Sequence, residues 1–181
     1  MSDNDRAIHK ISIYVTTVAS GITAVMIAFF LLFLVKMENR DHVFAPFNVV
    51  LLVGSLFVFF AQVSVTAQNI MNHNELRYIP SLDYPYLSFV NVFCIASAEL
   101  CFTIISWLRS RSIVGKVFPK LPRMLKVFVY VSPAFYYFQL VPETIELIPV
   151  LRVQLKKQQQ MLLILGSILS GATTLLFDTI L

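Results

Sequence analysis

Charged residues are scarce in this sequence. They make up only 13% of its 181 residues, against about a quarter in ordinary soluble domains. Hydrophobic residues make up 57%, and the mean hydropathy is +0.76. The apolar residues form long blocks without charges, so they cannot fill one compact core behind a polar shell. The composition therefore excludes a water-soluble globule and predicts a multispan integral membrane protein.

Histidine and cysteine are also rare, and their positions exclude several kinds of site. His9, His42 and His73 lie outside the apolar blocks, which excludes a haem or oxygenase centre built from intramembrane imidazoles. Cys94 and Cys101 lie within one block, where neither can form a disulfide with a loop. The sequence has no Gly-rich phosphate loop and no Gly-X-Ser-X-Gly element. We expect no enzyme activity, cofactor, metal site or nucleic-acid binding.

Five apolar blocks are long enough, or nearly so, to cross a bilayer as helices. A hydrocarbon core about 30 Å thick requires about 20 helical residues. We predict an all-α polytopic bundle in one membrane domain, with crossings at residues 11–35, 47–68, 84–108, 127–141 and 160–181. The fourth crossing is short and contains Pro133. Residues 143–157 predict either an interfacial amphipathic helix kinked at Pro149 or an extension of the fourth helix.

The loop between the third and fourth crossings contains six cations and no acid. Short loops rich in Lys and Arg usually face the cytoplasm. We therefore expect the N-terminus outside and the C-terminus inside. We also expect this basic loop to bind anionic lipid headgroups, because each cation near the surface contributes about 1 kcal/mol. Its cations are Arg109, Arg111, Lys116, Lys120, Arg123 and Lys126.

Glu99 is the residue that most directly suggests a function. Helical rise places it about 15 Å before Arg109, close to the middle of the bilayer. An ionised carboxylate there costs about 2.5 to 3.5 kcal/mol on insertion scales. The five blocks contain no Lys, Arg or His that could pair with it. We therefore expect Glu99 to be protonated at neutral pH unless a cation or water reaches it.

Hydroxyl groups on other crossings are expected at the depth of Glu99. If the helices are straight, Ser55, Tyr136 and Tyr137 lie near that level, and one of them is the expected hydrogen-bond partner. Two interpretations are open. Glu99 responds to a proton or a cation, or anchors a cationic ligand, or it is a neutral acid that only locks the third helix to its neighbours.

Other polar side chains predict which helix faces lie inside the bundle. Thr103 shares the Glu99 face of the third crossing. Gln62 has four hydrogen-bonding sites to satisfy and predicts a clamp between helices. In the last crossing, Ser167, Ser170 and Thr174 mark the expected inner face.

Two functions are compatible with this outline. The first is a receptor-like or scaffold protein, which the order of crossings and loops resembles by architecture alone. The chain stops at Leu181 directly after its last apolar block, which suggests a fragment of a seven-span protein; a natural five-span protein is the second alternative. The alternative is a small transporter or channel subunit in which Glu99 lines a path. The expected partner is the bilayer; self-association and a cytoplasmic partner protein remain open.

Overall fold

The computed structural model describes residues 3–36, 45–73, 83–117 and 121–180, and these residues form helices and no strand. The predicted all-α bundle is confirmed. The longer helices are α1 (Asp3–Lys36), α3 (Pro46–His73), α4 (Asp83–Val117), α5 (Leu121–Tyr137) and α8 (Lys156–Ile180). Two short helices, α6 (Leu140–Leu147) and α7 (Pro149–Gln154), connect α5 to α8.

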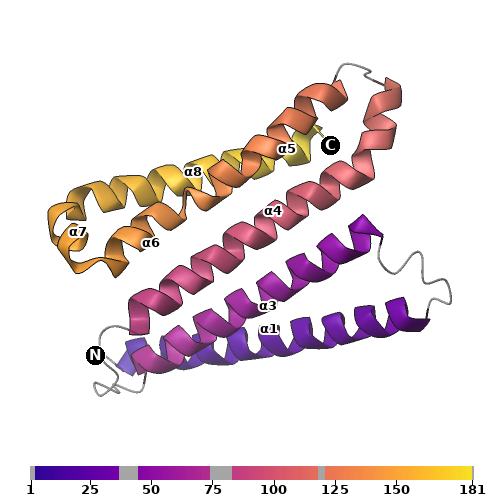
Figure 1. Cartoon of the computed structure of the whole chain (residues 1–181). Helices are drawn as coiled ribbons and strands as arrows, with labels where there is room; N and C mark the ends of the chain where they lie inside the picture. The colour runs from indigo at the N-terminus through magenta and orange to yellow at the C-terminus, as the bar shows by residue number, and fades with distance from the viewer. Residues whose placement is uncertain (1–2, 37–44, 74–82, 118–120, 181) are drawn as a thin grey trace.

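The helices pack in an order that follows the chain. Figure 1 shows α1, α3 and α4 side by side, with α5, α6 and α8 on the other side of α4. At one end of the α1–α3 contact, Asn69 Nδ2 donates to Ser12 Oγ at 3.0 Å. Helix α4 is therefore the central element, and its two faces contact different partners.

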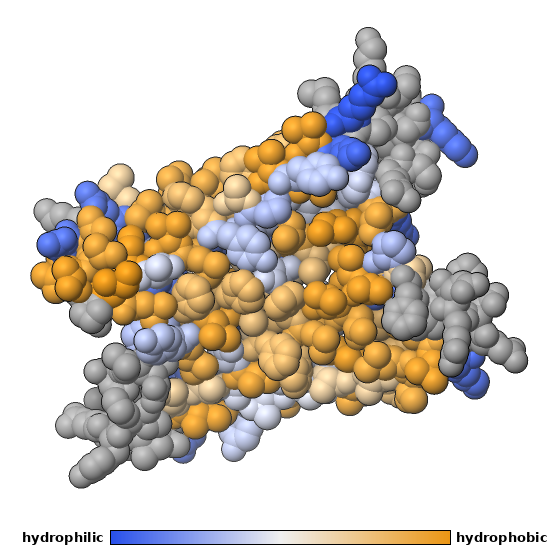
Figure 2. All heavy atoms as spheres, viewed as in Figure 1, coloured by the Kyte–Doolittle hydropathy of each residue, from blue (hydrophilic) through white to orange (hydrophobic). Residues whose placement is uncertain are grey.

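Four helices are long and apolar enough to cross a membrane, at Lys10–Lys36, Pro46–Met71, Pro85–Ser110 and Gln158–Phe177. Their outward faces carry large exposed apolar side chains, among them Met26 and Phe29 of α1. Figure 2 shows such side chains over most of the face in view, with strongly hydrophilic ones at its ends. A soluble protein rarely exposes so continuous an apolar surface, so the architecture is compatible with a multispan membrane protein.

The fourth predicted crossing differs from the expected continuous helix over 127–141. Helix α5 ends at Tyr137, and α6 begins at Leu140 after a turn at Phe138 and Gln139. The physical cause is Pro142, which has no N–H to donate to the carbonyl of Phe138. That carbonyl instead accepts from Val141 N at 3.1 Å, in a tighter turn.

Two further prolines remove backbone donors, and each loss is compensated locally. Pro133 cannot donate to the carbonyl of Val129, which accepts from Ser132 Oγ at 2.9 Å. The helix therefore continues through Pro133. Pro149 likewise cannot donate to the carbonyl of Ile145, which accepts instead from Ile148 N at 3.3 Å. There the chain becomes extended at Ile148, with φ −101° and ψ 106°, and the helix stops.

The segment 143–157 is therefore not one interfacial helix. Helix α6 follows α5 and ends at Leu147, the chain breaks directly before Pro149 where a kink was predicted, and α7 connects α6 to α8. Neither α5 nor α6 is among the four candidate spans, so the predicted fourth crossing is not matched by one of them. Helix α8 begins at Lys156, earlier than the predicted start at residue 160.

Gly54 allows a close approach between α3 and α4. A Cβ added there would lie 2.9 Å from Cys101 Cβ, and neither atom can move unless its helix moves. We expect Gly54→Ala to destabilise the protein by about 1–3 kcal/mol through overpacking, measured by thermal unfolding in detergent.

Gly21 provides the matched control, because a Cβ added there meets nothing within 4 Å. Gly21→Ala should be neutral or should stabilise by about 0.5–1 kcal/mol. Adding Cys101→Gly to Gly54→Ala should restore part of the lost stability. A Gly54→Ala protein as stable as wild type would show that α3 and α4 do not approach this closely.

Candidate functional site

Glu99 lies near the middle of the candidate span Pro85–Ser110, and two other helical segments donate hydrogen bonds to it. Ser170 Oγ from α8 donates to Glu99 Oε2 at 2.6 Å, and Gln139 Nε2 donates to the same oxygen at 3.2 Å. Ser170 is buried, whereas Glu99 and Gln139 are partly buried. The acid thus joins α4, α8 and the turn between α5 and α6, and we call these three residues the Glu99 centre.

The break between α5 and α6 and a close helix approach bring the Glu99 centre together. Gln139 stands in the turn that Pro142 imposes, at the N-cap of α6. Gly166 of α8 faces it, and a Cβ added to this glycine would lie 3.3 Å from Gln139 Cα. Because Gly166 has no side chain, α8 can lie against the turn, and one helical turn later it presents Ser170 to Glu99.

The expected hydrogen-bond partners of Glu99 are wrong. Tyr136 is fully buried and its hydroxyl pairs with Thr103 Oγ1 at 2.6 Å. Tyr137 pairs through its hydroxyl with Ser97 Oγ at 3.1 Å. Ser55 donates within its own helix, to the carbonyl of Leu51 at 2.9 Å. The two tyrosines nevertheless lie in the same α4–α5 interface, so they strengthen the packing beside the Glu99 centre.

Gln62 of α3 is not brought to Glu99 by any contact in the described part of the chain. Its Oε1 is buried and has no hydrogen-bond partner among those residues, so the predicted clamp between helices is not formed through this atom. The amide oxygen of Asn91 on α4 is also buried and has no hydrogen-bond partner among the described residues.

The inner face of α8 is displaced from the expected one. Ser167 is exposed and Thr174 only partly buried, whereas Gly166, Ser170 and Thr173 are buried. The packing of Phe177 explains the difference, because this side chain is 1% exposed and its ring lies 5.4 Å from that of Phe128 on α5. Phe177 and Ser170 lie two turns apart and fix the rotation of the helix.

Sequence reasoning missed Gln139 and Glu143. A signal for Gln139 was present, since it is an amide within the fourth apolar block, where the argument applied to Gln62 holds equally. Glu143 follows Pro142 and resembles a loop residue, yet it is only 8% exposed and its Oε2 has no hydrogen-bond partner among the described residues.

Glu143 lies outside the four candidate spans, at the end of the bundle where α6 meets the start of α4. Burial raises the pKa of this carboxyl above its ordinary value of 4.5. A hydrogen bond with the side chain of Ser88 opposes that rise, and the nearby charge of Glu146 adds to it. The neutral form of Glu143 is thus favoured by its surroundings.

Exposed cations gather where α4 ends and α5 begins. Arg109, Lys116, Arg123 and Lys126 are exposed, and Figure 2 shows strongly hydrophilic atoms at that end. Lys120 lies outside the described residues, as does the side chain of Arg111. The basic loop is therefore a cationic end of the bundle, separated along α4 from Glu143.

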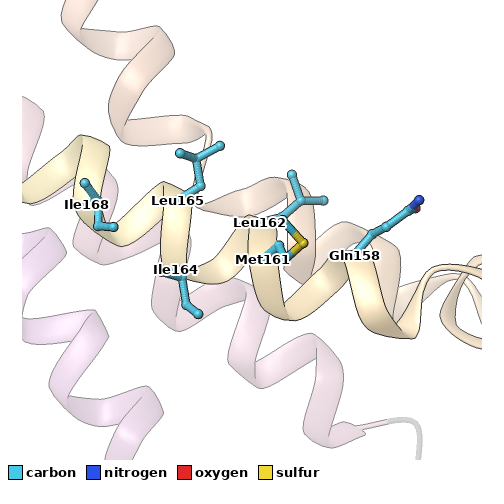
Figure 3. Close-up of a pocket in the computed structure, with 6 residues that line it drawn as sticks. All are labelled: Gln158, Met161, Leu162, Ile164, Leu165 and Ile168. Atoms are coloured by element: carbon cyan, nitrogen blue, oxygen red, sulfur yellow. The ribbon is translucent and has the colours of Figure 1, made fainter.

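A hollow of about 620 Å³ lies on the outer face of α8 and is separate from the Glu99 centre. Figure 3 shows its side chains, which come from one helix and are apolar except for Gln158. They offer few polar groups to fix the orientation of a ligand. Its lining residues are Gln158, Met161, Leu162, Ile164, Leu165 and Ile168.

Within the described ranges, no three His, Cys, Asp or Glu side chains are grouped so that they could hold a metal ion. Comparison with protein-family models, with curated proteins and with solved structures gives no match for this chain.

Ser170→Ala tests the Glu99 centre directly. The substitution removes the shorter of the two hydrogen bonds to Glu99 Oε2, and we expect a loss of about 1 kcal/mol in stability, measured by thermal unfolding in detergent. Ser167→Ala is the matched control, since Ser167 is exposed on the same helix, and it should leave the unfolding temperature unchanged. Equal effects of the two substitutions would contradict the assigned face of α8.

Proposed function

We propose that this chain is a small transporter or channel subunit in which Glu99 binds and releases a proton or a small cation inside the membrane. The observation that carries the proposal is the hydrogen bond from Gln139, at a helix break, to an acid near the middle of a candidate span. Interrupted helices with polar groups at the interruption are typical of ion and substrate sites in transporters.

The two hydrogen bonds to Glu99 both fall on one carboxyl oxygen. Both donors bind Oε2, so a proton on Oε1 leaves both hydrogen bonds intact. Ser170 and Gln139 therefore hold the carboxyl in position in either protonation state.

Proton flux into liposomes that contain the purified protein tests this function. Glu99→Gln preserves the size of the side chain but cannot ionise, so the flux under an imposed potential should fall to that of protein-free vesicles. An internal pH-sensitive dye gives the readout, and external Na⁺ or K⁺ gradients test the same variant for cation flux.

Ser97→Ala is the matched control for that experiment. It removes the hydrogen bond to Tyr137 on the same helix as Glu99, while the carboxyl remains, and its flux should equal that of wild type. Flux that Glu99→Gln leaves unchanged contradicts the proposal. A wild-type protein that conducts neither protons nor cations contradicts it as well and favours the receptor-like or scaffold alternative.

We also propose that the cationic end of the bundle faces the cytoplasm and binds anionic headgroups. Arg109, Lys116, Arg123 and Lys126 are exposed there, near the end of a candidate span, and each contributes about 1 kcal/mol toward an anionic surface. A hollow of about 280 Å³ at this end combines apolar side chains with one cation. Its lining residues are Ala45, Pro46, Phe47, Leu108 and Arg109.

Trp107 is the single tryptophan of the chain and reports on lipids near Arg109. In mixed vesicles, brominated phosphatidylserine should quench its fluorescence more than brominated phosphatidylcholine at the same mole fraction. Replacing Arg109 and Lys116 by Gln should remove that preference, whereas Lys10→Gln, near the start of α1, should not. Equal quenching by both lipids in the wild type would contradict the proposal.

A further inference from the structure

The hollow of about 280 Å³ at the cationic end lies between the start of α3 and the end of the candidate span in α4. Ala45, Pro46 and Phe47 line it at the start of α3, and Leu108 and Arg109 line it from α4. Figure 1 shows that α3 begins at the end of the bundle where α4 finishes. The hollow thus combines one cation with apolar walls from two helices.

The register of α3 against α4 places both walls at one level. The two helices meet where Gly54 faces Cys101. Pro46 lies eight residues before Gly54, which is about 12 Å along α3. Arg109 lies eight residues after Cys101, which is about 12 Å along α4. Because the helices run in opposite directions, Pro46 and Arg109 lie at the same depth.

This depth is that of the lipid phosphate groups. The candidate spans Pro46–Met71 and Pro85–Ser110 each have 26 residues, which is about 39 Å at 1.5 Å per residue. A bilayer measures about 40 to 45 Å with its headgroups, around a hydrocarbon core of about 30 Å. The ends of these two spans therefore reach the headgroup region, and the hollow lies there.

The charge of Arg109 is available to an anion in the hollow. The Arg109 side chain is exposed, and no ion-pair partner for it exists among the described residues. The first turn of α3 contains no acid. A guanidinium group can donate to two phosphate oxygens at once, which makes arginine well suited to bind a phosphate.

The apolar walls and the volume limit what can occupy the hollow. Phe47 is 38% exposed and Leu108 is partly buried, so both offer carbon surface beside the cation. A volume of 280 Å³ corresponds to about nine water molecules at about 30 Å³ each. This space suits a phosphate and the glycerol next to it. A free phosphate ion has no apolar part to place against Phe47 and Leu108.

We propose that this hollow binds one anionic phospholipid, with its phosphate on Arg109 and its glycerol against Phe47 and Leu108. The acyl chains lie along the apolar outer surface, and the lipid joins the start of α3 to α4. This inference rests on the proposed binding of anionic headgroups and adds a single saturable site to it. The headgroup beyond the phosphate lies outside the hollow, so the site selects lipids by their charge.

Native mass spectrometry of the full chain in detergent, with added lipid, tests the site. One dioleoyl phosphatidylglycerol should bind at saturation, and phosphatidylserine should bind with a similar affinity. Phosphatidylcholine should bind more weakly, because its choline cation lies near Arg109. Strong binding of only one of the two anionic lipids would overturn the selection by charge.

Arg109→Gln should weaken phosphatidylglycerol binding about fivefold, and Phe47→Ala should weaken it by removing an apolar wall. Lys116→Gln is the matched control for charge. Lys116 is exposed on the same helix but lies about 10.5 Å beyond Arg109, more than a Debye length at physiological salt. This control should bind one lipid with the wild-type affinity.

Glycerol 3-phosphate distinguishes a lipid from a soluble phosphate. It carries the phosphate without acyl chains and should not displace the bound lipid. Displacement would show that a soluble phosphate compound is the ligand and would overturn the lipid site.

Two acids that precede the hollow in the sequence provide a further control. Glu38 and Asp41 lie outside the described residues. The double variant Glu38→Gln/Asp41→Asn should leave the lipid affinity unchanged. An increase as large as the loss in Arg109→Gln would show that one of these acids occupies Arg109, and would overturn the site.

The outcomes separate the lipid site from the proposed function. If lipids bind without saturation and Arg109→Gln and Lys116→Gln weaken binding equally, the single site fails and the surface preference of the cationic end stands. If both brominated lipids quench Trp107 equally in vesicles, but one lipid binds in detergent and is lost in Arg109→Gln, the surface preference fails and the site stands. Neither result depends on flux through Glu99.

Discussion

A carboxyl group inside an apolar span must receive its hydrogen bonds from other helices, and this requirement organises one side of the bundle. The apolar block around Glu99 contains no Lys, Arg or His, and the hydroxyls of Ser97 and Thr103 on the same helix pair with tyrosines of α5. Ser170 and Gln139 supply the two hydrogen bonds to Glu99, and each has to come from a separate segment. Gly166 allows α8 to approach and place Ser170 beside Glu99, and the turn between α5 and α6 places Gln139 there.

Proline is what makes the turn available. In a membrane an unpaired backbone carbonyl costs several kcal/mol, so a helix can be interrupted only where the freed groups find new partners. Here the carbonyls of Val129, Phe138 and Ile145 each find one nearby. A hydroxyl preserves the helix at Pro133, whereas a tighter backbone turn ends it before Pro142 and Pro149. The three prolines therefore leave none of these carbonyls unpaired.

The sequence was sufficient for the helical class and for four of the five predicted crossings, which correspond to long apolar helices. It was not sufficient for the partners of Glu99, because depth estimates assumed a straight fourth helix. Tyr136 and Tyr137 lie before the break and pair with Thr103 and Ser97, and the turn that follows them brings Gln139 to the acid. The rotation of α8 was not predictable either, because serine and threonine can bond to their own helix and hydroxyl spacing does not identify a buried face. The buried ring of Phe177 sets the rotation of α8.

The close contact at Gly54 and the helix breaks lie on different sides of α4. A Cβ added at Gly54 would lie 2.9 Å from Cys101 Cβ on the side that faces α3, whereas the turn between α5 and α6 contacts Glu99 from the other side. Substitutions that disturb one of these contacts therefore act on a different neighbour of α4 from substitutions that disturb the other.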